Sequence, residues 1–111
     1  MAQIKMVALT TPLPGKEGEF NDWYQNAHLP ELVNGLSMQG AQRYKLVAKM
    51  AGADENQYLA IYDIEADDPG AFLAQMGEFA GSGQMTPPTT QDMATTYLGV
   101  FVEHGERVTP G

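Results

Sequence analysis

The densest group of chemically useful side chains in this sequence lies in the segment from Asp22 to Leu32. This segment holds the one tryptophan of the chain, a tyrosine, one of the two histidines and a proline. A histidine changes its charge near neutral pH and can work as a general acid or base. His28 is therefore the first candidate for chemistry.

A helix over residues 16–28 is predicted to position this histidine. Successive residues of a helix are turned by about 100°, so Phe20, Trp23 and Tyr24 share one stripe. His28 lies at the edge of that stripe, one turn after Tyr24. The imidazole is then half covered by aromatic surface near the negative end of the helix, where burial lowers its pKa and the helix dipole raises it.

Pro30 is predicted to end this helix near His28. Proline lacks an N–H, its ring clashes with the carbonyl four residues earlier, and it pushes the preceding residue away from helical geometry. A histidine at a helix end can also simply donate a hydrogen bond to one of the last carbonyl groups. Spacing alone leaves both roles of His28 open, the structural one and the chemical one.

Charge excludes several classes of partner. The chain has fourteen acidic and six basic residues, which give a formal net charge of −8, and lysine and arginine form no cluster. Such a chain repels a nucleic-acid backbone and an anionic membrane surface, so we expect neither as a partner. The sequence contains no cysteine, which excludes disulfides, thiolate metal sites and a cysteine nucleophile.

Length and the first residues indicate one soluble domain. A chain of 111 residues can bury a single hydrophobic core. Residues 1–6 lack the basic stretch and apolar core of a signal peptide, and no apolar run is long enough to span a membrane. We therefore expect a cytoplasmic protein whose domain covers residues 1–104, followed by a C-terminal tail of residues 105–111.

Four strands and two helices are predicted in the order βαββαβ. Alternating or two-sided apolar patterns predict strands over residues 3–10, 37–48, 57–65 and 93–103. The second helix begins with Asp68 as N-cap and Pro69 in the first turn. Its apolar stripe, which is assigned to the core, consists of Phe72, Leu73, Met76, Phe79 and Ala80.

Two of the connections raise alternatives. Residues 81–90 form a loop of unusual length, which is either a lid over a ligand site or an ordinary connection. If the second and third strands form a hairpin about residues 51–56, Arg43 lies near Asp63 and a cross-strand ion pair is expected. Should Arg43 face a pocket instead, it is a candidate to hold an acidic substrate.

This order of elements predicts an α+β, ferredoxin-like fold, in which a four-stranded antiparallel sheet carries both helices on one face. The first and last strands are apolar on both faces, yet two helices can cover only one face. The other face needs a partner, and the same face of a second copy is the simplest one. Sheet packed on sheet predicts a homodimer.

Several short segments carry a family resemblance, namely Val7–Thr10, Pro14–Gly15, Glu19–Phe20, Asp22–Tyr24, His28–Glu31, Ala41–Tyr44 and Tyr58–Tyr62. Together they extend over nearly the whole chain and resemble the dimeric α+β barrel superfamily, in its EthD-like branch. The resemblance implies that two sheets form a barrel across a dimer, with a pocket in each subunit between helices and sheet. Relatives include cofactor-free monooxygenases, polyketide cyclases, isomerases, lyases and proteins of unknown role, so shared fold does not decide function.

The first functional hypothesis is a cofactor-independent cyclase, isomerase or lyase that acts on a small hydrophobic, aromatic or carbonyl-bearing molecule. By position, His28 matches the histidine of the family, and Trp23 and Tyr24 match its aromatic residues. His28 is then the general base, and the hydroxyl of Tyr24 holds a developing enolate oxygen. The candidate residues for substrate binding are Trp23, Phe20, Arg43, Tyr44, Tyr62 and Met76, with Tyr58 as a further hydroxyl.

Two alternatives use the same pocket. A cofactor-free monooxygenase would deprotonate a phenol whose anion reacts with dioxygen, and a non-catalytic dimer would only bind a hydrophobic compound. A metal site at His28 and Glu31 is disfavoured, because Pro30 lies between them and disturbs their spacing. A serine hydrolase is disfavoured as well, because Ser37 and Ser82 lack the sequence context of a nucleophile.

Overall fold

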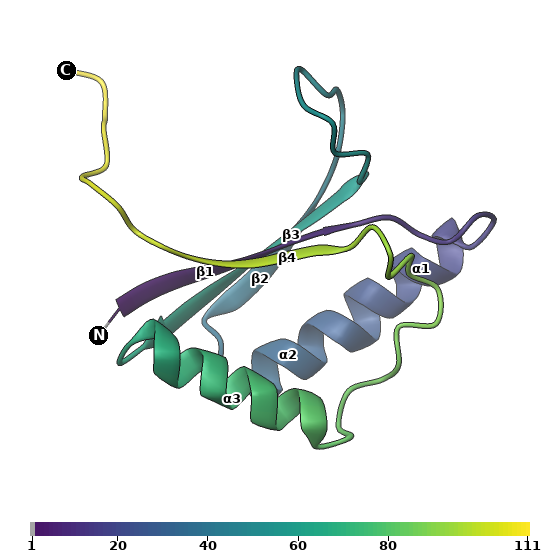
Figure 1. The fold of residues 1–111 in the computed structure, drawn as a ribbon, viewed down its shortest axis with the longest axis horizontal. Helices are drawn as coiled ribbons and strands as arrows, with labels where there is room; N and C mark the ends of the chain where they lie inside the picture. Colours follow the sequence, from purple (N-terminus) through teal and green to yellow (C-terminus); the bar gives the residue numbers. More distant parts are fainter. Residues whose placement is uncertain (1) are drawn as a thin grey trace.

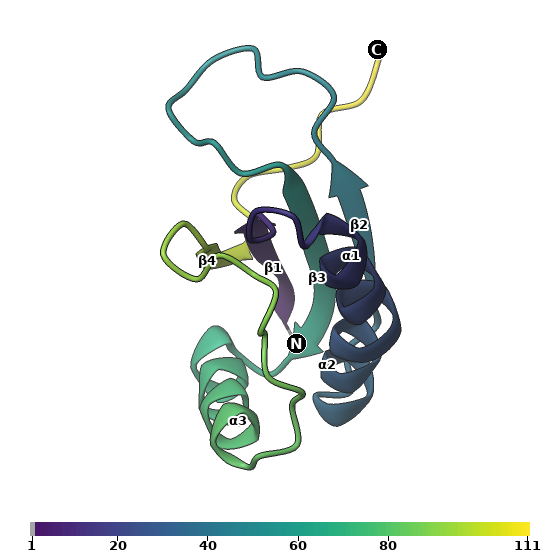
Figure 2. The same cartoon turned by 90° about the vertical axis from the view of Figure 1, so that its right-hand side faces the viewer.

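One antiparallel sheet of four strands forms the centre of the protein in a computed structural model that describes residues 2–111. The strands are β1 (Ala2–Thr10), β2 (Gly40–Lys45), β3 (Tyr58–Ala66) and β4 (Tyr97–Val102), in the spatial order β2-β3-β1-β4. The helical segments are α1 (Glu17–Trp23), η1 (Tyr24–His28), α2 (Leu29–Gly35) and α3 (Pro69–Gly81). All of them lie on one side of the sheet (Figure 1), where α3 stands beside the run from α1 to α2 (Figure 2). The predicted ferredoxin-like order and layering are therefore confirmed. Met1, the first residue of the predicted domain, lies outside the described residues.

Alternation along the strands builds the face of the sheet that meets the helices. In β1, Ile4, Met6 and Ala8 are buried, whereas Lys5 between them is exposed. The core that forms on this face also contains Tyr58, Ala60, Tyr62 and Ile64 from β3, and Phe20, Tyr24, Leu29, Leu32, Phe72 and Phe79 from the helical segments. Removal of these apolar side chains from water is the main stabilising contribution to the fold.

The opposite face of the sheet, which we call the open face, is also apolar. Its residues include Val7, Leu9, Tyr44, Leu59, Ile61, Tyr97 and Phe101. No helix of the described chain lies over it, and in Figure 1 only the β2–β3 loop and the C-terminal tail project to that side. Tyr97 and Phe101 are 44% and 48% exposed. The prediction that the first and last strands are apolar on both faces is therefore confirmed.

The first helix does not end near His28, so that prediction is wrong. The chain runs from α1 through η1, a π-helical turn, directly into α2. The N–H of Leu29 donates to the carbonyl of Tyr24, five residues earlier, which widens the turn. Pro30 then stands in the first turn of a new α-helical segment, where a missing N–H is tolerated. The widened turn thus allows the helix to pass a proline.

Helix α3 begins as predicted, with Asp68 as N-cap accepting a hydrogen bond of 2.8 Å from the N–H of Ala71. Phe72 and Phe79, seven residues apart on one face, are buried. Leu73 is 53% exposed, so its assignment to the core is wrong. It is turned by about 100° from Phe72 and points past the edge of the packed face. Within residues 2–111, no helix is both long enough and apolar enough to cross a bilayer.

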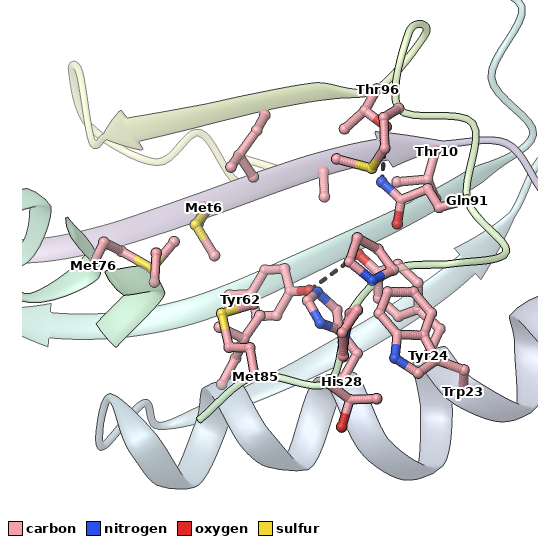
Figure 3. Close-up of a pocket in the computed structure, with 18 residues that line it drawn as sticks. Met6, Thr10, Trp23, Tyr24, His28, Tyr62, Met76, Met85, Gln91 and Thr96 are labelled. Atoms are coloured by element: carbon pink, nitrogen blue, oxygen red, sulfur yellow. Dashed lines mark hydrogen bonds between the residues drawn. The ribbon is translucent and has the colours of Figure 1, made fainter. Parts of the chain in front are cut away.

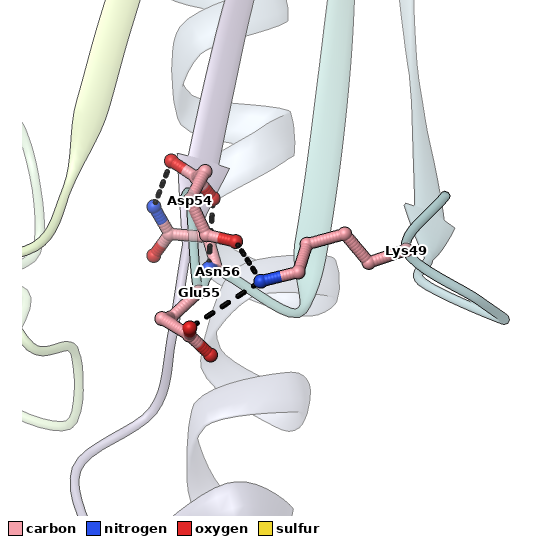
Figure 4. A network of polar contacts seen from close by, with 4 residues as sticks. All are labelled: Lys49, Asp54, Glu55 and Asn56. Carbon is pink, nitrogen blue, oxygen red and sulfur yellow. Dashed lines mark hydrogen bonds and ion pairs between the residues drawn. The ribbon is translucent and has the colours of Figure 1, made fainter. Parts of the chain in front are cut away.

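The second and last strands are shorter than the predicted ranges of 37–48 and 93–103. A long connection follows β2 as a result, and polar contacts hold its end (Figure 4). The Lys49 ammonium lies 3.3 Å from a carboxylate oxygen of Glu55, and the N–H of Asn56 donates over 2.8 Å to the Asp54 carboxylate. The Asn56 amide also donates over 2.8 Å to the carbonyl of Thr95, which joins this connection to the segment before β4.

The predicted ion pair between Arg43 and Asp63 does not form. Arg43 is paired in register with Ala60, on the face that meets the helices, whereas Asp63 is opposite Gly40 on the open face. Asp63 forms its ion pair with Lys5 of β1 instead. Arg43 is paired with Ala60 rather than with Asp63, so the register differs by three residues from the one expected for a hairpin about residues 51–56. Because side chains alternate along a strand, an odd shift places the two residues on opposite faces.

Candidate functional site

A cavity of about 390 Å³ lies between the sheet and the helical segments. Its walls come from β1, the Trp23–His28 part of the first helical run, Tyr62 of β3, one side of α3, and the segment of residues 82–96 that follows α3 (Figure 3). We call residues 82–96 the covering segment, because Met85, Pro88, Gln91 and Met93 from it close one side of the cavity. Such a volume suits a small-molecule ligand.

Five of the predicted site residues line this cavity, namely Trp23, Tyr24, His28, Tyr62 and Met76. Phe20, Arg43 and Tyr44 are not among its lining residues. Phe20 is fully buried beneath the aromatic side chains, and Tyr44 is 50% exposed. Tyr44 is paired in register with Leu59 on the open face, so the sheet separates it from the cavity.

The imidazole of His28 stacks on the indole of Trp23. Their ring centroids are 4.7 Å apart with an angle of 27° between the planes, and the Tyr24 ring meets His28 edge-on at 4.8 Å. In an α-helix, residues five apart point about 140° away from each other, which would prevent this stacking. The π-helical turn of η1 brings such residues into line. The turn that carries the chain past Pro30 therefore also builds the site.

Burial lowers the pKa of His28 from 6.5 to about 4. The nearby charge of Glu31 raises this pKa and that of Arg43 lowers it, but both effects are smaller than that of burial. The imidazole is thus neutral at pH 7. Its Nδ1 atom is buried and, within the described part of the chain, has no hydrogen-bond partner, and the same holds for Nε1 of Trp23. A buried polar atom without a partner is costly, and at a cavity wall it marks a place for a ligand.

Tyr24 and Tyr62 form a pair of hydroxyl groups in the wall of the cavity (Figure 3). Their oxygen atoms are 3.1 Å apart. Burial raises the pKa of both phenols, so both remain protonated at neutral pH. One hydroxyl donates to the other, and the proton of the second is available to a ligand oxygen.

Arg43 lies behind the aromatic wall of the cavity. Its guanidinium carbon is 4.6 Å from the centroid of the Tyr24 ring and 5.2 Å from that of Tyr58. Its Nη2 atom donates a hydrogen bond of 2.8 Å to the side-chain oxygen of Asn21. Arg43 thus places a positive charge next to the phenol of Tyr24, outside the space that a ligand can fill.

Comparisons with known proteins identify the fold. No protein-family model and no curated protein sequence matches this chain. Among solved structures, an ethyl tert-butyl ether D (EthD) family protein from Bacillus halodurans matches with a TM-score of 0.58 and 17% identity, over 96% of this chain and 99% of that one. An uncharacterized NIPSNAP domain protein from Burkholderia xenovorans matches with a TM-score of 0.60 and 16% identity over the same shares. HapK from Hahella chejuensis matches with a TM-score of 0.54 and 18% identity over 100% of both chains.

The chain shares the fold of these solved structures, which we call the EthD-like fold after the first of them. The fold of the single subunit that the sequence resemblance implies is therefore confirmed, while the barrel across a dimer stays a prediction. At identities of 16–18% the likeness extends to the fold alone, and function has to be argued from the side chains of the site.

In this EthD-like fold, hydrogen bonds to Glu31 hold the covering segment against the first helical run. Its carboxylate accepts hydrogen bonds from the N–H of Thr86 over 2.9 Å and from the hydroxyl of Thr86 over 2.5 Å. These two hydrogen bonds hold the pKa of Glu31 below its usual value, and the bond from the hydroxyl has the larger effect. Glu31 stands one helical turn after His28, so one carboxylate both anchors the wall of the cavity and lies near its histidine.

The sequence analysis did not predict that Gln91 of the covering segment lies at the cavity. Gln91 is 8% exposed and donates over 2.7 Å to the hydroxyl of Thr96, and its carbonyl oxygen points into the cavity in Figure 3. The length of the loop at residues 81–90 was the one pattern that pointed here. Within residues 2–111, no group of three or more His, Asp or Glu side chains is arranged to hold a metal ion.

Proposed function

We propose that the protein is a cofactor-independent enzyme that moves a proton on a small hydrophobic ligand, with His28 as the base. The observation that carries this proposal is the neutral imidazole in the cavity wall, stacked on Trp23 and without a hydrogen-bond partner for Nδ1 in the described chain. A neutral imidazole is the form that accepts a proton. The EthD-like fold supports a ligand site between helices and sheet but does not choose the reaction.

Two charges flank the site in an order that suits proton transfer. When His28 takes a proton from the ligand, an imidazolium and a ligand anion form together. Glu31 lies on the side of the imidazolium, where its charge raises the pKa of His28. Arg43 lies behind the Tyr24 ring, 4.6 Å from its centroid, on the side of the hydroxyl pair. In a cavity lined by uncharged and mostly apolar groups, fixed charges in this arrangement stabilise the ion pair as it forms.

The hydroxyl groups of Tyr24 and Tyr62 would hold the anion. Both phenols keep their protons at neutral pH, because burial raises the pKa of each. An enolate or phenolate oxygen of the ligand would accept the free O–H of this pair. The C–H or O–H bond of the ligand would break as His28 takes its proton, and the tyrosine pair would stabilise the electron pair left on oxygen.

Replacing His28 by glutamine is expected to slow proton abstraction by about 100-fold or more. A suitable probe is 2-acetonaphthone, an uncharged aryl ketone whose methyl protons exchange with solvent deuterium once an enolate forms. The rate of deuterium incorporation in D₂O, followed by mass spectrometry, measures the step directly. Tyr24→Phe should show a smaller loss, because Tyr62 can still donate to the enolate.

The control variant is His104→Gln, which changes the other histidine, an exposed residue after β4 and just before the C-terminal tail. It should exchange deuterium as fast as the wild type. If 2-acetonaphthone binds in the cavity but exchanges no faster than in buffer, the protein is not a base catalyst for this ligand class. That outcome favours a dimeric binding protein instead.

We also propose that the protein is a homodimer in which the open faces of two copies pack against each other. The open face combines Val7, Leu9, Leu59 and Ile61 at its centre with the half-exposed rings of Tyr97 and Phe101. An apolar sheet face of this kind is unfavourable in water, and a second copy is complementary to it by symmetry. The EthD-like fold, known from dimeric α+β barrel proteins, supports the same arrangement.

Replacing Ile61 by lysine on the open face is expected to convert the dimer into a monomer. In a monomer the lysine can extend into water, so the fold should remain intact. In the dimer two lysines would be buried in an apolar interface, which is strongly unfavourable. Light scattering after size-exclusion chromatography gives the mass. Leu73→Lys, on the exposed side of α3, adds the same charge and should leave the mass unchanged.

A further inference from the structure

We propose that the cavity selects uncharged aromatic ligands that carry a hydroxyl or carbonyl group and rejects the corresponding carboxylates. This inference rests on the proposed function, in that it takes the cavity to be a ligand site. It concerns the charge of the ligand, which the fold does not specify. It also opposes the sequence-based option that Arg43 holds an acidic substrate.

The first argument is the charge of the cavity wall. Within the described part of the chain, none of the side chains that line the cavity belongs to an aspartate, glutamate, lysine or arginine. An ionised carboxylate that leaves water needs a counter-ion and several hydrogen bonds. Here it would meet only uncharged groups, namely a neutral histidine, neutral phenols, an indole, threonine and glutamine side chains, and apolar groups, so no counter-ion is present. The net charge of −8 adds a long-range repulsion of anions.

The second argument is that the two nearest charged side chains are already engaged. The Arg43 guanidinium donates to Asn21 and lies against the Tyr24 ring, so the ring separates it from a ligand. The Glu31 carboxylate accepts two hydrogen bonds from Thr86 and is held at the outer side of the wall. Neither can form a direct ion pair with a ligand unless it leaves these contacts.

The third argument is that the cavity wall contains groups suited to an uncharged aromatic ligand. Met6, Met76, Met85 and Met93 line the cavity together with the flat indole of Trp23. Thioether side chains adapt to the edges of aromatic rings and contact them favourably. The polar groups of the wall include a free O–H of the Tyr24–Tyr62 pair and the carbonyl oxygen of Gln91. They also include the side-chain nitrogens of His28 and Trp23 that have no partner in the described chain. The free O–H and the carbonyl oxygen match one oxygen and one O–H of an uncharged ligand.

The methionines provide the experiment. Isotope labelling of their methyl groups gives NMR signals from four residues in the cavity and from two reference sites, the buried Met38 and Met50, which is 97% exposed. The probes are 2-naphthol, 2-acetonaphthone and 2-naphthoate at pH 7, which share one ring system. We expect both uncharged probes to shift the four cavity signals selectively, and 2-naphthoate to bind at least tenfold more weakly.

The outcomes separate this inference from the proposed function. If 2-naphthoate shifts the cavity signals with an affinity within threefold of the uncharged probes, the inference is wrong while the cavity stands as a ligand site. If no probe shifts the four signals more than those of Met38 and Met50, the cavity binds none of them, and the inference and the proposed function both fail. Binding of the uncharged probes without proton exchange contradicts only the proposed reaction.

A variant with a positive charge in the cavity wall tests the inference in the opposite direction, because it should favour the carboxylate. Met93→Lys adds a cation to the wall at a position that is 58% exposed, so the folded structure can accommodate it. We expect this variant to bind 2-naphthoate at least tenfold more tightly than the wild type. Met50→Lys changes the net charge of the protein equally but lies outside the cavity and should have no such effect. Equal gains in both variants would show that overall charge, not the cavity wall, excludes carboxylates.

Discussion

Replacing Phe20 by alanine is expected to destabilise the protein by about 3–5 kcal/mol, because the whole ring is lost from a tightly packed site. Phe20 is 0% exposed, and its ring contacts those of Trp23, Tyr24 and Tyr58 at centroid distances of 6.2, 5.5 and 5.6 Å. Chemical denaturation measures the free energy of unfolding. Because small domains have about 5–15 kcal/mol in total, Phe20→Leu serves as a milder second variant.

The same substitution should disturb the candidate site, although Phe20 does not line the cavity. Its ring supports Trp23 and Tyr24 from below, and Trp23 is the only tryptophan in the chain. The fluorescence and near-ultraviolet dichroism of Trp23 should therefore change in folded Phe20→Leu. Phe72→Leu, an equally buried site on α3, should cost similar stability and leave the Trp23 spectrum unchanged. If the Trp23 spectrum of Phe20→Leu is the same as that of Phe72→Leu, Phe20 has no special supporting role for Trp23.

Lowering the pH from about 7 to about 4 is expected to remove as much as about 3 kcal/mol of stability through His28 alone. Unfolded His28 binds a proton at its ordinary pKa of 6.5, whereas the folded protein resists protonation until the pH reaches about 4. Between these values the unfolded state binds more protons, so the free energy of unfolding falls as the pH falls. The full contribution of the neutral imidazole is present above pH 6.5.

Carboxylates titrate in the same pH range, so the difference between two proteins has to be measured. His28→Gln has no titrating group at this position and should lose less stability between pH 7 and pH 4.5 than the wild type. NMR titration of the His28 ring protons gives the pKa directly. The prediction is wrong if the pKa of His28 is near 6.5 and the free energy of unfolding depends on pH in the same way in both proteins. The imidazole would then be hydrated by water in the cavity.

The faces of the strands could be predicted from sequence because side-chain direction alternates locally. Alternation over residues 57–65 places Tyr58, Tyr62 and Ile64 on one face of their strand, and all three are buried against the helices. The pairing of strands was harder to predict, since it depends on the connection between them. A hairpin about residues 51–56 predicts Arg43 near Asp63, whereas the observed register pairs Arg43 with Ala60. Its partners, Asn21 and the Tyr24 ring, come from a distant part of the chain.

The helix through Pro30 shows how a local rule is overruled. The rule that proline ends a helix considers only the hydrogen bonds and contacts within one regular turn. Here the helix changes to a π-helical turn, and packing of Leu29 and Leu32 in the core stabilises the continuation into α2. This change of turn is also what stacks His28 on Trp23, a contact that α-helical spacing would not produce.

The sequence by itself determined the order of elements, the apolar character of both sheet faces, and the neighbourhood of Trp23, Tyr24 and His28. These features depend on periodicity and on short separations along the chain. Only the tertiary structure decided that Tyr62 pairs with Tyr24, that Arg43 stays behind the aromatic wall, and that Gln91 faces the cavity. Such contacts join segments far apart in sequence, and their distances follow from strand register and core packing, which local patterns do not encode.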